Sequence, residues 1–137
     1  MRVVFALYAG LAYTVFLASF LYAIGFVGNL PLVPKSIDSG APGALVPALI
    51  IDLLVLGAFA IQHSLMARPA FKRWWTRFVP VPMERSTYVL FASLLLFLLF
   101  AVWRPLPAPV WTVVAPLGSA LLTGLSWAGW LIVLCST

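Results

Sequence analysis

The polar groups that could take part in chemistry are few in this chain, and most of them lie between residues 52 and 88. The single histidine, His63, stands between Gln62 and Ser64 and five residues before Arg68. An imidazole in this position can act as a general base or can hold a bound group. The alternative is a structural histidine that bonds a backbone carbonyl near the end of a helix. The sequence alone leaves both interpretations open.

Asp52 is an acid inside an otherwise apolar run. A carboxylate at the centre of a bilayer costs about 2.5–3.5 kcal/mol on insertion scales. Asp52 falls about 10 Å from the start of its run, so the cost is smaller there. A structural role, as a hydrogen bond to a neighbouring helix or a reach toward the outer interface, is favoured over a proton or substrate contact. Asp52 and His63 share a helical face but stand about 16 Å apart, so they do not form a pair.

Several classes of site are absent from the sequence. With one cysteine, Cys135, the chain forms no internal disulfide, and with one histidine it predicts no metal site. It contains no glycine-rich phosphate loop, no nucleophile elbow and no zinc signature. The net charge of +5 comes from few, clustered bases, which indicates membrane topology and not a nucleic-acid partner.

The composition predicts the element class that must position these groups. Of the 137 residues, 64% are hydrophobic and 8% are charged, and the mean hydropathy is +1.13. Such a chain cannot cover a water-exposed surface with polar groups, so lipid is its solvent. In lipid the backbone must satisfy its own hydrogen bonds, and no long alternation of apolar and polar residues indicates a barrel. The sequence therefore predicts an all-α membrane protein.

Four hydrophobic runs predict transmembrane helices over residues 3–27, 45–66, 84–103 and 111–134, within one transmembrane domain over residues 1–137. Small residues recur every fourth position in the first and last helices. These residues are Ala6, Gly10, Thr14 and Ala18, and then Ala120, Gly124 and Ala128. Such stripes let helices pack closely in lipid, and a homo-oligomer is one way to use them.

A short amphipathic helix over residues 69–79 is predicted between the second and third spans. Its aromatic residues share one face and its polar residues the other. The two sets are Phe71, Trp74, Trp75 and Phe78, and then Lys72, Arg73, Thr76 and Arg77. This segregation indicates a helix that lies flat at a membrane surface, in preference to a solvated basic loop.

The segment Arg68–Arg85 carries five bases and one acid, a net charge of +4. The positive-inside rule places it in the cytoplasm, and four spans then place both termini there as well. Its bases are expected to contact anionic lipid headgroups.

The stretch from Phe59 to Pro80, with its Gln-His-Ser helix end and Trp-Trp helix, followed by Glu84-Arg-Ser-Thr-Tyr88, resembles a known family. It is similar to the bacterial NnrU-like membrane proteins, and in particular to the methanethiol S-methyltransferases, relatives of the isoprenylcysteine carboxyl methyltransferases. The resemblance implies a bacterial inner-membrane enzyme that uses S-adenosylmethionine to methylate a small thiol, such as methanethiol, giving dimethyl sulfide. The thiolate is the nucleophile in such a reaction.

The resemblance makes His63 the candidate catalytic residue. The residues expected near the substrate or cofactor all lie at the cytosolic ends of the spans. They are Gln62, Ser64, Arg68, Glu84, Arg85 and Tyr88.

The resemblance also implies that most of the cofactor site lies in a C-terminal part with an Arg-His-Pro type motif, which this chain does not contain. We therefore expect the chain to be the N-terminal half of such an enzyme and to be inactive alone. Two alternatives remain: a non-catalytic NnrU-like protein linked to nitrogen-oxide metabolism, and a small transporter or assembly subunit that dimerises through its small-residue stripes.

Overall fold

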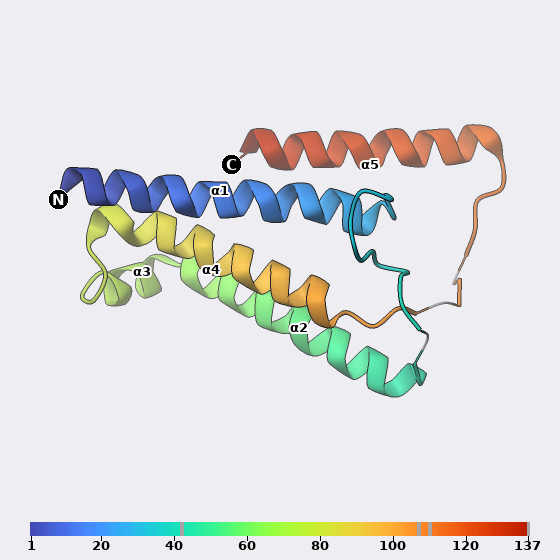
Figure 1. Ribbon diagram of the computed structural model, residues 1–137, viewed down its shortest axis with the longest axis horizontal. Helices are drawn as coiled ribbons and strands as arrows, with labels where there is room; N and C mark the ends of the chain where they lie inside the picture. Colours follow the sequence, from blue (N-terminus) through green and yellow to red (C-terminus); the bar gives the residue numbers. More distant parts are fainter. Residues whose placement is uncertain (42, 107, 110, 137) are drawn as a thin grey trace. The chain divides into compact units, whose positions relative to one another are not determined.

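The computed structural model describes residues 1–41, 43–106, 108–109 and 111–136, and within them the secondary structure is entirely helical (Figure 1). The helices are α1 (Arg2–Val27), α2 (Leu45–Ala67), α3 (Pro69–Trp75), α4 (Val81–Val102) and α5 (Pro116–Ser136). Four of them, α1, α2, α4 and α5, are long and apolar enough to cross a membrane. This confirms the predicted all-α fold class with four candidate membrane spans.

Three helix ends differ from the predicted bounds by three residues or more, and prolines explain two of them. α4 begins at Val81 and not at 84, because Pro82 is tolerated in a first helical turn, where its missing N–H needs no partner. α5 begins at Pro116 and not at 111, since a proline disfavours helical geometry in the residue before it. α3 ends at Trp75, and the N–H groups of Arg77 and Phe78 instead bond carbonyls three residues earlier.

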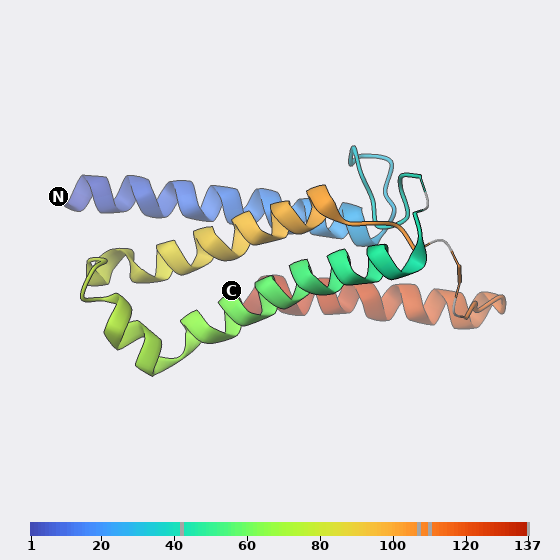
Figure 2. The same ribbon diagram turned by 90° about the horizontal axis from the view of Figure 1, so that it is seen from below.

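The chain forms two compact units, residues 1–106 and residues 107–137. In the first unit α4 is the central helix and contacts both α1 and α2, while α3 joins α2 to α4 (Figures 1 and 2). Because α3 and its turns reverse the chain direction, the last turns of α2 lie beside the first turns of α4 (Figure 2). This hairpin brings residues near 63 next to residues near 88.

Aromatic rings and small residues hold α1 against α4. The ring of Phe100 stacks on Tyr22 and contacts Phe26, each at a centroid distance of 4.9 Å. Small side chains are buried in the same unit, namely Ala12, Ser19 and Ala23 on α1 and Ser93 on α4. Small residues let two helix backbones approach closely in lipid, where apolar surface alone gives little drive to associate.

The predicted stripe on the first span does not make this contact. Ala6, Gly10, Thr14 and Ala18 are all exposed, and a methyl group added at Gly10 would meet no atom within 4 Å. α1 packs instead through the face that carries Phe20 and Phe26, whose rings supply more contact area than the stripe can. A homo-oligomer through the exposed stripe stays a prediction.

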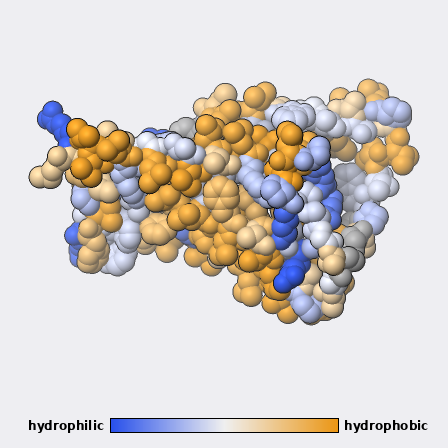
Figure 3. Space-filling model, viewed as in Figure 1, coloured by the Kyte–Doolittle hydropathy of each residue, from blue (hydrophilic) through white to orange (hydrophobic). Residues whose placement is uncertain are grey.

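In the second unit, α5 has no buried residue along its described length, including its own small-residue stripe. Exposed leucine, isoleucine and valine side chains are frequent on all four long helices. Figure 3 shows hydrophobic side chains covering the middle of the visible face of the molecule. An apolar exterior of this extent suits lipid tails and makes this a multi-pass membrane protein.

Candidate functional site

His63 on α2 and Tyr88 on α4 meet where these helices lie side by side. The Tyr88 hydroxyl lies 2.9 Å from Nδ1 and 3.1 Å from Nε2 of His63. Phe59, one helical turn before His63, stacks on the imidazole at a centroid distance of 5.4 Å and 26° between planes. The imidazole therefore contacts two aromatic rings, and His63 remains exposed.

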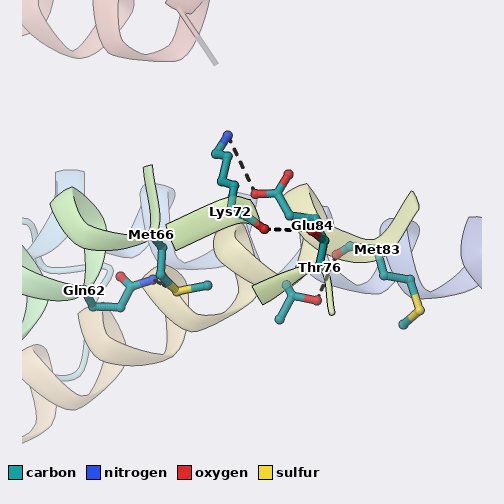
Figure 4. A network of polar contacts seen from close by, with 7 residues as sticks. Gln62, Met66, Lys72, Thr76, Met83 and Glu84 are labelled. Carbon is teal, nitrogen blue, oxygen red and sulfur yellow. Dashed lines mark hydrogen bonds and ion pairs between the residues drawn. The ribbon is translucent and has the colours of Figure 1, made fainter. Parts of the chain in front are cut away.

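Gln62 offers a buried polar atom at the same end of α2. Its Nε2 donates to Sδ of the buried Met66 at 3.1 Å, but its Oε1 is buried and has no partner among the described residues (Figure 4). The indole N–H of Trp75 on α3 is likewise buried without a partner in the described part of the chain. Unpaired buried groups cost free energy, so a donor or acceptor from a bound molecule would stabilise them.

α3 is attached to α4 by charge and by aromatic contact. Lys72 Nζ lies 3.6 Å from Glu84 Oε1 in the first turn of α4, as Figure 4 shows. Trp75 packs edge-on against Phe91 of α4 at a centroid distance of 6.4 Å. A half-exposed ion pair contributes only about 0–1 kcal/mol to stability. The ring contact is therefore expected to contribute more to holding α3 against α4.

The side chains of α3 and of the turn after it separate less cleanly than the sequence pattern predicts. Trp74 and Phe78 are exposed, whereas Phe71 and Trp75 are partly buried, and the bases Lys72, Arg73 and Arg77 are exposed. The helix itself is present in the structure. Its position at a membrane surface stays a prediction.

Ser64 and Arg68 lie on a different side of α2 from Gln62. They line an open groove of about 460 Å³ together with Ala60, Ile61 and Leu65. Gln62 and Ser64 are two residues apart, a rotation of about 200° on a helix, so their side chains diverge. Among the site residues predicted from the sequence, His63 therefore contacts Tyr88, whereas Ser64 and Arg68 lie along this separate groove.

Thr87, which sequence reasoning did not select, ties this end of α4 to α1. Its hydroxyl donates to the carbonyl of Met83 at 2.8 Å and therefore accepts from the hydroxyl of Tyr8, 3.0 Å away.

The sequence analysis also did not select Phe59, although its i, i+4 spacing to His63 could have revealed the contact between them. Lys72 and Tyr8 carried no comparable signal, because their partners lie on other helices.

Asp52 lies at the other end of the first unit, away from His63. It is 3% exposed, and its Oδ1 accepts the backbone N–H of Arg104, just past α4, at 2.9 Å. Its Oδ2 is buried and has no partner among the described residues. This geometry accords with a structural role, and a role in proton or substrate contact stays a prediction.

Lys35, in the segment that joins α1 to α2, caps the end of α4 beside Asp52. Its Nζ donates to the carbonyls of Ala101 at 2.7 Å and Trp103 at 2.9 Å. A cation at a helix C-terminus satisfies carbonyls that have no partner in the helix. Burial lowers the pKa of Lys35 below 10.5, and the charge of Arg104 lowers it further, while Asp52 acts in the opposite direction.

The sequence is similar, along nearly its whole length, to proteins named methanethiol S-methyltransferase. It is 55% identical to methanethiol S-methyltransferase 2 of Bradyrhizobium diazoefficiens over 136 residues, which cover 99% of this chain and 52% of that protein. It is 51% identical to methanethiol S-methyltransferase of Mycobacterium tuberculosis over 131 residues, 96% of this chain and 53% of that protein. A more distant similarity, 36% identity over 140 residues, links 81% of the chain to 53% of nurim of Bos taurus.

The chain thus spans about half the length of the curated relatives it matches. No protein-family model matches the sequence, and no solved structure matches it significantly.

We expect Lys35→Met to lower the free energy of unfolding by about 1–3 kcal/mol, because two helix-end carbonyls lose a charged donor. The measurement is thermal or denaturant unfolding in detergent micelles. Arg2→Met, which removes an exposed base at the start of α1, is the matched control. Equal stability of the two variants would show that the cap contributes nothing.

Lys35 also predicts a pH dependence. Because its pKa is lowered in the folded protein, the unfolded chain binds more protons between that lowered value and 10.5. This group's contribution therefore makes stability rise with pH across that window, and the rise should be absent from Lys35→Met.

Proposed function

The chain is a homologue of the methanethiol S-methyltransferases, and on this ground we propose that it forms the membrane-embedded part of a thiol methyltransferase. The proposed methyl donor is S-adenosylmethionine, and the proposed acceptor is a small thiol such as methanethiol, which would yield dimethyl sulfide. The observation that carries the proposal is 55% identity over 99% of the chain to a protein named for this reaction.

The reaction sets clear demands on a site. The S–H bond of the thiol breaks and its proton passes to a base, since the thiolate is the nucleophile. The thiolate sulfur forms a bond to the methyl carbon, and the bond from that carbon to the sulfonium sulfur breaks, its electron pair remaining on the leaving sulfur. A site must therefore hold the two sulfurs in line, accept one proton and limit competing water.

The residues around His63 fit these demands chemically. In this proposal His63 accepts the proton, because it is the exposed imidazole at this end of α2 and α4. The methyl donor supplies a sulfonium cation, which aromatic faces attract, and Phe59 and Tyr88 provide such faces beside His63. The unpaired Oε1 of Gln62 and N–H of Trp75 are available to polar groups of a bound molecule.

The other predicted residues have supporting parts in the proposal. Glu84 holds α3 through Lys72, and Ser64 and Arg68 line the groove on α2. Arg85 lies one helical turn before Tyr88 and supplies a positive charge near the same end of α4. No observation favours a non-catalytic nitrogen-oxide-linked protein or a transporter subunit over the methyltransferase.

We expect membranes that contain the full reading frame encoding this chain to convert methanethiol and S-adenosylmethionine into dimethyl sulfide, measured by headspace gas chromatography. His63→Ala should lower the rate by about 10²–10⁴-fold, the usual contribution of a general base.

Cys135→Ser is the control variant, because it changes a single exposed atom on α5, in the other compact unit from the one that contains His63. Product levels no higher than in empty membranes would reject the proposed reaction. An undiminished rate in a correctly inserted His63→Ala variant would reject His63 as the base.

We further propose a bacterial inner-membrane location with both termini in the cytoplasm. The support is the excess of bases around α3, between α2 and α4. Cys135, at the last turn of α5, reports this topology directly because it is exposed.

A membrane-impermeant maleimide should label Cys135 in inside-out vesicles and not in intact spheroplasts, with Cys135→Ser as the background. Labelling in intact spheroplasts would reverse the assignment.

The exposed bases of α3 and of the turn after it are proposed to contact anionic lipid headgroups. Arg73 and Arg77 are both exposed, and the neighbouring Trp74 and Phe78 expose aromatic surface that suits a lipid interface.

The double variant Arg73→Gln/Arg77→Gln should retain less phosphatidylglycerol after purification from mixed vesicles, measured by lipid mass spectrometry. Arg104→Gln, an exposed base past the opposite end of α4, is the control. Equal retention in the native chain and both variants would exclude headgroup binding at α3.

A further inference from the structure

The contact between His63 and Tyr88 has an unusual symmetry. The Tyr88 oxygen lies within hydrogen-bonding distance of both ring nitrogens, 2.9 Å from Nδ1 and 3.1 Å from Nε2. The hydroxyl therefore lies beside the imidazole at similar distances from its two nitrogens. Either nitrogen can pair with Tyr88, and the other is then left for a second partner.

A hydroxyl suits both protonation states of an imidazole. It donates to the lone pair of a neutral ring and accepts from an N–H of the charged ring. Tyr88 can thus remain bonded to His63 before and after His63 takes up a proton. An amide or an ammonium group in its place could not exchange the two roles on one atom.

The surroundings fix the positions of both partners. Phe59 stacks on His63 and restricts rotation of the ring. Thr87, next to Tyr88, is bonded to Met83 of its own helix and to Tyr8 of α1. The first turns of α4 are therefore held against α1, and the Tyr88 side chain projects from an anchored segment.

We infer that Tyr88 is a positioning residue that acts through His63, holding the imidazole so that one nitrogen stays free to receive the proton of the thiol. This assigns Tyr88 to His63 and not to substrate or cofactor contact. The inference rests on the proposed function, in which His63 accepts that proton. The proton moves from sulfur to the free ring nitrogen while Tyr88 stays bonded to the other, and the imidazolium later releases it to water.

The kinetic test compares Tyr88→Phe with Tyr13→Phe in membranes containing the full reading frame. Both variants remove one hydroxyl, but Tyr13 is 39% exposed on α1 and lies outside the site. Tyr88→Phe should lower kcat about 5–10-fold, the factor that one hydrogen bond supplies. The KM for methanethiol should change less than about twofold, and Tyr13→Phe should match the native protein.

A spectroscopic test does not depend on activity. The chain has one histidine, so ¹⁵N-histidine labelling reports His63, and signals absent from His63→Asn complete the assignment. In Tyr88→Phe the resonance of the nitrogen that pairs with the hydroxyl should move, because hydrogen bonding alters its shielding. In Tyr13→Phe both nitrogen resonances should stay in place.

Each outcome decides the inference or its premise. Unchanged nitrogen resonances in Tyr88→Phe would show that the hydrogen bond is not formed and would overturn the inference. A raised KM with native kcat would make Tyr88 a substrate contact, and a native kcat with native KM would remove its role. No dimethyl sulfide from the native protein, together with a shifted resonance in Tyr88→Phe, would reject the methyltransferase while the hydrogen bond stands.

Discussion

Cross-helix hydrogen bonds onto α4 hold the first unit in register. An apolar environment offers no water to a buried polar group, so each such group must find a partner on another segment. At one end of α4, Tyr8 bonds Thr87 and His63 bonds Tyr88. At the other end, the carbonyls of Ala101 and Trp103 accept from Lys35, and the N–H of Arg104 donates to Asp52. Helices α1 and α2 are thereby fixed relative to α4 at both of its ends.

The two ends of α4 differ in what they leave open. The segment after α1 closes one end, since Trp103 donates its indole N–H to Ile37 and Tyr22 donates to the carbonyl of Lys35. Gly25 allows this closure, because a methyl group at that position would clash with Val33. The other end keeps an exposed imidazole and an unpaired Gln62 oxygen. This asymmetry places the chemically available groups beside α3.

The proposed function gathers these features around one reaction. A small apolar thiol dissolves readily in lipid, so a site between the ends of membrane helices would meet its substrate there. A charged methyl donor would arrive from water, on the side where α3 exposes its bases. His63 lies in the last turns of α2, between the apolar middle of the helix and that charged segment. The relatives that the chain matches are about twice as long as the chain.

The sequence by itself determined the elements and their order. Runs of 20 or more apolar residues can satisfy their backbones in lipid only as helices, so the four long helices and their approximate bounds followed from hydropathy alone. The gathering of Gln62, His63, Glu84 and Tyr88 near one end followed too, since a short connection must return the chain at that end.

Only the tertiary structure decided which faces of the helices and which atoms meet. The stripe from Ala6 to Ala18 and the face of Phe20 and Phe26 are both plausible packing surfaces in one helix, and in the structure the second is buried while the first is exposed. Likewise, His63 meets Tyr88 and Lys35 meets the end of α4 because of helix rotation and register, which a single sequence does not encode as any local pattern.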